Sequence, residues 1–123
     1  MITASVTFSP ATHNFRMALT DNTNHHHFAV SRKCAASSCP RSSAEFISEA
    51  PFVDGRQASL ADYRMESFVS TAITSSAGKT GGLSSKRWTA TRIVQVGHKT
   101  NKLIAIPTAL HGRSFTNHWH GEK

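Results

Sequence analysis

Hydrophobic positions repeat with helical spacing in the middle of the chain. Ser59 and Asp62 match a capping box, in which the two side chains bond to free backbone amides at a helix start. Gly78 is a natural helix terminator. Between these signals, apolar residues recur every three or four positions, as on one face of an α-helix. They are Ala61, Met65, Phe68, Val69, Ala72 and Ile73. The pattern predicts one amphipathic helix over 59–76.

Residues 87–106 have the composition of a β-hairpin. Residues 88–96 alternate in part between apolar and polar side chains, and residues 102–106 form a second apolar run that ends before Pro107. Residues 97–101 have turn chemistry, as does Asp54-Gly55 further upstream. Because a lone hairpin is marginal in water, we expect the helix to cover one of its faces. The predicted fold class is therefore small α+β, with one amphipathic helix and a C-terminal β-hairpin.

The first third of the chain shows no periodicity that predicts a regular element. It is rich in Ser, Thr, Asn and His, which predicts a largely disordered N-terminal segment over 1–44. The same composition, with Arg and only one acid, is also typical of an organelle transit peptide. The expected organisation is thus a disordered or targeting-like segment (1–44), a minimal helix plus hairpin unit (45–110) and a His-containing tail (111–123).

The net charge of +7 is unevenly distributed. Acids are concentrated between 45 and 66, and none occurs between 67 and 121. A basic field attracts nucleic acid, anionic membranes or acidic protein surfaces. On the expected hairpin, cations would contact phosphates while a tryptophan stacks on a base. The candidate contact residues are Lys86, Arg87, Trp88, Arg92, Lys99 and Lys102.

Metal ligands form a second group of candidates. Cys34 and Cys39 have a zinc-like spacing and follow a run of three histidines. Residues 118–121, His-Trp-His-Gly, resemble the segment of multicopper oxidases in which two histidines bind copper. The other histidine segments of that family are absent from the sequence. The resemblance therefore implies at most a weak Cu²⁺ or Ni²⁺ site at His118 and His120. The sequence therefore indicates no definite cofactor, and zinc or copper is the alternative that these residues leave open.

Other functional classes lack signals. No apolar run approaches the ~20 residues of a membrane span, and no apolar core of a secretory signal follows the start. We therefore expect a soluble chain, intracellular rather than secreted, with organelle targeting as the alternative. Residues 77–82 contain Gly-Lys-Thr, but the first glycine of a P-loop is replaced by Ile73. Glu45 and Glu49 share a helical face by spacing, which indicates a solvated surface, and no catalytic motif occurs.

Three interpretations of function follow. The first is a small basic accessory protein, not an enzyme, that binds nucleic acid or an acidic protein surface through residues 86–102. The second is a His/Cys-rich chain that binds Zn²⁺ or Cu²⁺. The third is a recently arisen or dubious reading frame without a selected activity, which the weak periodicity also fits.

Overall fold

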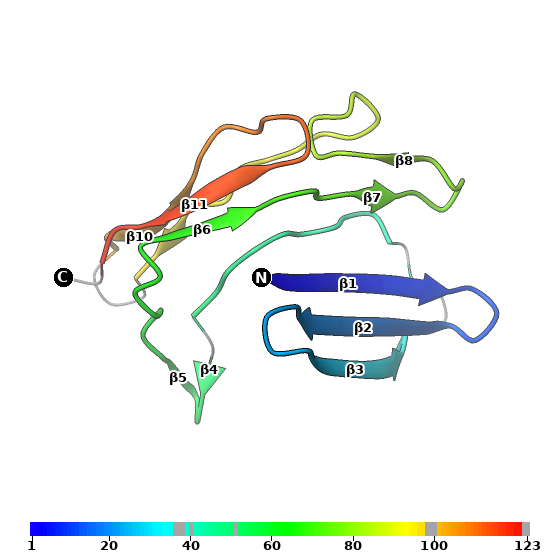
Figure 1. The fold of residues 1–123 in the computed structure, drawn as a ribbon, viewed down its shortest axis with the longest axis horizontal. Helices are drawn as coiled ribbons and strands as arrows, with labels where there is room; N and C mark the ends of the chain where they lie inside the picture. Colours follow the sequence, from blue (N-terminus) through cyan, green and yellow to red (C-terminus); the bar gives the residue numbers. More distant parts are fainter. Residues whose placement is uncertain (36–38, 40, 51, 98–100, 122–123) are drawn as a thin grey trace. The chain divides into compact units, whose positions relative to one another are not determined.

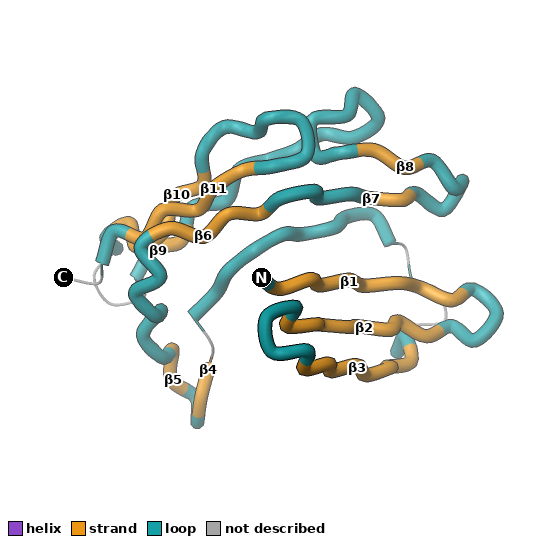
Figure 2. Tube along the Cα trace, viewed as in Figure 1, coloured by secondary structure: helices purple, strands orange, loops and turns teal. Residues whose placement is uncertain are grey.

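The described part of the chain is built from β-strands. The computed structural model describes residues 1–35, 39, 41–50, 52–97 and 101–121, without the side chains of Phe52 and Gln57. None of these residues is helical, and the strands that they form belong to four antiparallel sheets (Figures 1 and 2). The chain divides into two compact units, Met1–Ser43 and Ala44–Lys123. The predicted α+β class is therefore wrong, and the fold is all-β.

The first unit is a three-stranded antiparallel meander. Strands β1 (Ile2–Ser9), β2 (Asn14–Asp21) and β3 (His26–Lys33) follow one another in space as they do in sequence (Figure 1). Neither strand pair has a break in register. The disorder predicted for 1–44 is thus wrong for the part of this segment that forms the sheet, Ile2 to Lys33.

An alternation of side chains explains why this segment forms a sheet. The even positions of β1 carry Ile2, Ala4, Val6 and Phe8, and the last three lie opposite Leu19, Met17 and Phe15 of β2. Residues paired across antiparallel strands share a face, so the apolar side chains gather on one side. The serines and threonines that favour disorder by composition supply the polar side. The alternation of apolar and polar side chains, with a period of two residues, can therefore be read in the sequence of β1.

The second unit contains a four-stranded sheet. Its order is β6 (Met65–Phe68), β11 (Phe115–Trp119), β10 (Leu103–Pro107) and β9 (Gln95–Val96). Strands β9 and β10 pair antiparallel, with an irregular register between Leu103 and Ala105. The expected hairpin is therefore much shorter than 87–106, because residues 89–94 belong to no strand.

The predicted helix over 59–76 is also wrong. Strand β6 and strand β7 (Ile73–Thr74) lie in this range, and β7 pairs with β8 (Thr80–Gly81). The carboxylate of Asp62 accepts a hydrogen bond from the backbone of Arg64 at 3.0 Å, which forms a turn instead of a helix cap. Residues 67–74 are rich in β-branched residues, which favour strands, and in serine, which disfavours helix interiors.

A short hairpin connects the start of the unit to its main sheet. Strands β4 (Phe52–Val53) and β5 (Arg56–Gln57) pair antiparallel around Asp54 and Gly55. Both turn residues have positive φ, 51° and 73°, as a two-residue type I′ turn requires. The turn predicted at this position is confirmed.

The hydrophobic core of the second unit is small. Ala50, Leu60, Ile104 and Ala105 are buried together, and Tyr63 and Trp119 pack against them. Ile104 keeps only 1% of its surface exposed. Within the described residues, no helix is long and apolar enough to cross a membrane.

Candidate functional site

One face of the four-stranded sheet gathers polar side chains. Glu66 of β6 lies directly opposite Asn117 of β11, so the two residues share this face. Trp119 of β11 and Gln95 of β9 both pair with Ala105 of β10, which places them on the same side. The face therefore combines a carboxylate, two amides and an indole within four adjacent strands.

An irregular segment, residues 44–50, is fixed to this face, and we call it the strap. The hydroxyl of Ser48 donates a hydrogen bond to Oε2 of Glu66. The side-chain amide of Gln95, oriented to satisfy both of its polar atoms, donates to the carbonyl of Ser48 at 3.1 Å and accepts from the backbone N–H of Ala50 at 3.0 Å. Ala50 itself is 6% exposed and belongs to the core. Two side chains of the sheet thus hold the strap.

Glu49 lies between the two backbone groups that Gln95 binds. Its neighbours Ser48 and Ala50 are fixed by hydrogen bonds and by burial, whereas the side chain of Glu49 is exposed. Glu45, four residues earlier, is also exposed, and its neighbour Ala44 is exposed as well. The strap therefore presents the carboxylate of Glu49 to solvent on a firmly held backbone.

A hydrogen bond joins Tyr63 to Asn117 and so adds a phenol to the polar side chains of the sheet face. The side-chain amide of Asn117 donates to the phenolic oxygen of Tyr63 at 2.9 Å. Asn117 is 7% exposed, and its Oδ1 and the Nε1 of Trp119 form no hydrogen bond among the described residues. Burial, and secondly the charge of Glu66, raise the pKa of Tyr63 above its ordinary value of 10.0. The cluster thus keeps the phenol neutral beside a carboxylate.

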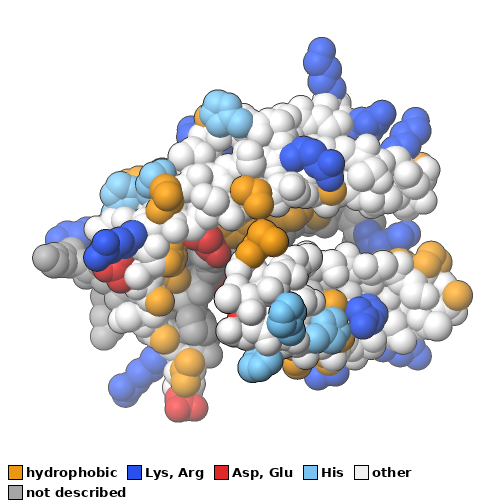
Figure 3. Space-filling model, viewed as in Figure 1, with side chains coloured by type: hydrophobic (Ala, Val, Ile, Leu, Met, Phe, Trp, Pro, Cys, Tyr) orange, Lys and Arg blue, Asp and Glu red, His pale blue; other side chains and the backbone are white. Residues whose placement is uncertain are grey.

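The predicted nucleic-acid contacts are spread over loops instead of a hairpin. Lys86, Arg87 and Arg92 are exposed in irregular segments, and Lys102 is exposed just before β10. The guanidinium of Arg87 donates to the carbonyl of Thr80 at 3.4 Å. Lys99 lies outside the described residues. Figure 3 shows Lys and Arg side chains on both units and few acidic side chains on the face drawn.

Trp88 has a packing role. It is half-buried, and its indole N–H donates to the carbonyl of Leu83 at 3.3 Å. A Cβ added at Gly81 would lie 3.0 Å from the ring atom Cη2 of Trp88. The ring therefore covers the glycine at the end of β8, which limits the area it offers to a nucleobase.

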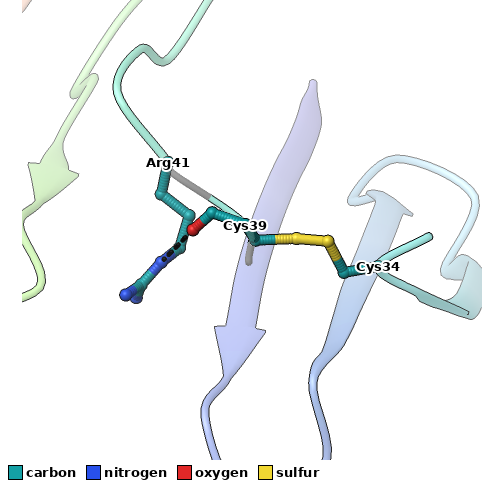
Figure 4. Close-up of a disulfide and its surroundings, with 3 residues drawn as sticks. All are labelled: Cys34, Cys39 and Arg41. Atoms are coloured by element: carbon teal, nitrogen blue, oxygen red, sulfur yellow. Dashed lines mark hydrogen bonds between the residues drawn. A yellow bond between two sulfur atoms is a disulfide. The ribbon is translucent and has the colours of Figure 1, made fainter. Parts of the chain in front are cut away.

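The predicted metal ligands do not converge. Cys34 and Cys39 form a disulfide, so neither sulfur is a thiolate in this structure, and the carbonyl of Cys39 accepts from Arg41 (Figure 4). His118 and His120 are exposed at the end of β11. Within the part of the chain that the structure describes, no three His, Cys, Asp or Glu side chains are grouped to hold a metal ion. Zinc or copper binding stays a prediction.

Sequence reasoning gave no role to Glu66 and Gln95, and it treated Glu49 only as part of a solvated surface. The helical spacing of Glu45 and Glu49 predicts a shared face, but the strap is not helical, and successive residues of it face different surroundings. The concentration of acids between 45 and 66 was the available signal. A pattern of residues does not show that a glutamine from position 95 reaches the strap.

Comparison with known proteins gives one structural likeness. No family model and no curated protein matches the sequence. The chain is similar to the crystal structure of aspergilloglutamic peptidase from Aspergillus niger, with a TM-score of 0.75 and 18% sequence identity. The match covers 98% of this chain and 66% of that chain. At this identity the likeness shows a shared fold, and the chain spans about two thirds of the peptidase chain.

This likeness corrects the expectation of a non-enzymatic protein. That expectation depended on the absence of catalytic motifs, yet the fold found here is one that a peptidase also has. Catalytic groups that are far apart in sequence leave no local motif, so their absence from the sequence carries little weight.

The single tyrosine of the chain reports on the polar cluster. Because the pKa of Tyr63 is raised in the folded chain, its phenol should ionise at a higher pH than in urea. Its contribution to the free energy of unfolding is full below the unfolded-state pKa and is lost as pH rises through the folded-state pKa. Absorbance titration of the phenolate measures the shift, and E66Q should reduce it. Equal midpoints in the folded and urea-unfolded chain would contradict this assignment.

Proposed function

We propose that the chain hydrolyses peptide bonds, with Glu49 as the general base. The observation that carries this proposal is the anchoring of the strap on both sides of an exposed glutamate. A catalytic carboxylate needs access to water and substrate together with a fixed position, since misplacement of a reacting group by about 1 Å costs roughly 100-fold in rate. Glu49 combines access to solvent with a backbone that is held on both sides.

Glu66 fits a supporting role better than a catalytic one. Its carboxylate accepts the hydroxyl of Ser48 and is half-buried, so its charge is used to hold the strap. It also lies beside the neutral phenol of Tyr63. We therefore assign Glu66 as a positioning residue, which acts on the reaction through the backbone of the strap.

The chemistry proceeds by addition of water to the peptide carbonyl. The carboxylate of Glu49 takes one proton from water as the water oxygen bonds to the carbonyl carbon. The resulting tetrahedral intermediate breaks its carbon–nitrogen bond, and the proton returns to the leaving nitrogen. One water is consumed, a carboxyl and an amine are formed, and the glutamate is regenerated. The fold likeness supports this reaction class, since the matched protein is named aspergilloglutamic peptidase.

A pair of matched variants tests the role of Glu49. E49Q removes the base while it keeps the size of the side chain, so cleavage of an unfolded protein substrate should fall by about 100-fold or more. E45Q removes the other exposed glutamate of the same strap and should leave cleavage unchanged. Product formation by mass spectrometry measures both. The absence of cleavage by the parent chain, or full activity of E49Q, would contradict the proposal.

A second candidate function is binding of a polyanion. The specific observation is the stretch between 67 and 121, which contains no acid, together with the exposure of Lys86, Arg87 and Arg92. Exposed cations without neighbouring acids attract phosphates through counterion release. The candidate contacts are those named from the sequence, apart from the half-buried ring of Trp88.

Salt dependence tests this second function. If all seven cations of the acid-free stretch contacted phosphates, log Kd for single-stranded RNA would change with log salt by a slope of about 5. Fluorescence anisotropy over a salt series measures the slope, and K86A/R87A should reduce it by about 0.7 for each cation removed. A slope near zero, or no binding at low salt, would exclude polyanion binding as a function of this chain.

A further inference from the structure

The sheet of the first unit has two edges of different character. Strand β3 is protected, because it carries Arg32 and Lys33 at one end and histidines at the other. Strand β1, with the sequence Ile-Thr-Ala-Ser-Val-Thr-Phe-Ser, has no charged residue, no proline and no bulge against β2. Edge strands are usually protected from pairing with other chains by charges, prolines or bulges. Strand β1 has none of these protections.

The edge of β1 is also accessible. The side chains of residues 2–7 are exposed, with Ile2 at 55% and Val6 at 69%. Among the described residues β1 pairs with β2 alone. In an antiparallel ladder, alternate residues direct their N–H and C=O groups to opposite edges, so half of the backbone groups of β1 point away from β2.

We propose that this edge pairs with β1 of a second copy of the chain, antiparallel and across a twofold axis at Ser5. This register places Ile2 opposite Phe8 and Ala4 opposite Val6 on the apolar face. On the polar face it places Thr3 opposite Thr7 and Ser5 opposite its own copy. A shift of this register by one residue would place apolar residues opposite polar ones. The alternation of β1 therefore favours registers that keep apolar residues opposite apolar ones.

The self-complementary alternation of β1 favours a second copy as the occupant of the edge, because pairing with itself places apolar residues opposite apolar ones. Two copies with a net charge of +7 repel each other through most of their surface. Strand β1 is uncharged over its eight residues, so like charges are fewest there, and the one cation seen on it is Arg41, whose guanidinium lies 4.4 Å from the centroid of the Phe8 ring. An isologous contact of identical strands also closes at two copies, because each β1 has one free edge.

Pairing would also extend an existing surface. The apolar face of the first unit already includes Val6, Leu19 and Phe28, which are 69%, 44% and 62% exposed. Joining two β1 strands makes one sheet of six strands in the order β3-β2-β1-β1-β2-β3, with this face continuous across the axis. The apolar pairs at the new junction are removed in part from water.

Introduction of like charges at the axis tests the proposal in the full chain. T3K/S5K/T7K places three lysine pairs directly opposite each other at the β1 junction. H27K/A29K/S31K adds three lysines at the other edge of the same sheet, in the same three cross-strand rows and on the same face. Both variants raise the net charge by the same amount, and circular dichroism checks that both fold.

Sedimentation over a range of concentrations measures the result. The parent chain should form a dimer, the β1 lysine variant should weaken it by about tenfold or more, and the β3 lysine variant should leave it nearly unchanged. Mixing T3K/S5K/T7K with T3E/S5E/T7E should restore a dimer that contains one copy of each. A monomeric parent chain, or equal weakening by the two lysine variants, would overturn the proposal. Restored pairing in the mixture excludes misfolding as the cause and excludes an unrelated extended peptide as the occupant.

Discussion

The second unit depends on how an irregular segment is joined to a sheet. Residues 44–50 form no strand, so their backbone groups have no ladder partners. The side-chain amide of Gln95 supplies a donor and an acceptor with the geometry of a peptide group, and it bonds to Ser48 and Ala50 on either side of Glu49. The hydroxyl of Ser48 adds a bond to the carboxylate of Glu66, which is a charge-assisted contact and stronger than a neutral one. Burial of Ala50 in the core cluster adds to these bonds at the end of the strap.

The small core makes these polar contacts more important. Four buried residues with two partly buried aromatic rings form the cluster that supports the sheet face. Tyr63 belongs to both the hydrophobic core and the polar contacts, since its ring packs on the core and its hydroxyl accepts a hydrogen bond from Asn117. Its neutral phenol beside Glu66 is consistent with a local environment of reduced polarity. The proposed role of Glu49 follows from this arrangement, because the anchored strap fixes the backbone from which the exposed carboxylate extends.

Parts of the fold are visible in the sequence and others are not. The Asp54-Gly55 turn follows from local chemistry, since two consecutive positive φ angles favour these residue types. The sheet of the first unit was within reach of the same reasoning, because Ile2, Ala4, Val6 and Phe8 alternate with hydroxylated residues. The helical stripe over 59–76 misled because Met65 and Phe68 have helical spacing yet lie on opposite faces of β6. The candidate site could not be predicted from the sequence, because it depends on hydrogen bonds between Gln95 and residues 48 and 50, which are far from it in the chain.

Hydrogen exchange at the backbone amide of Ala50 tests whether Gln95 holds the strap in place. This amide belongs to a segment without a strand, so only its bond to the side chain of Gln95 and its burial slow its exchange. We expect protection similar to that of the His120 amide, which bonds to the carbonyl of Ile104 in the sheet, and selective loss of the Ala50 protection in Q95A. An Ala50 amide that exchanges as fast as that of exposed Glu45, or one that Q95A leaves unchanged, would contradict the anchoring of the strap by Gln95.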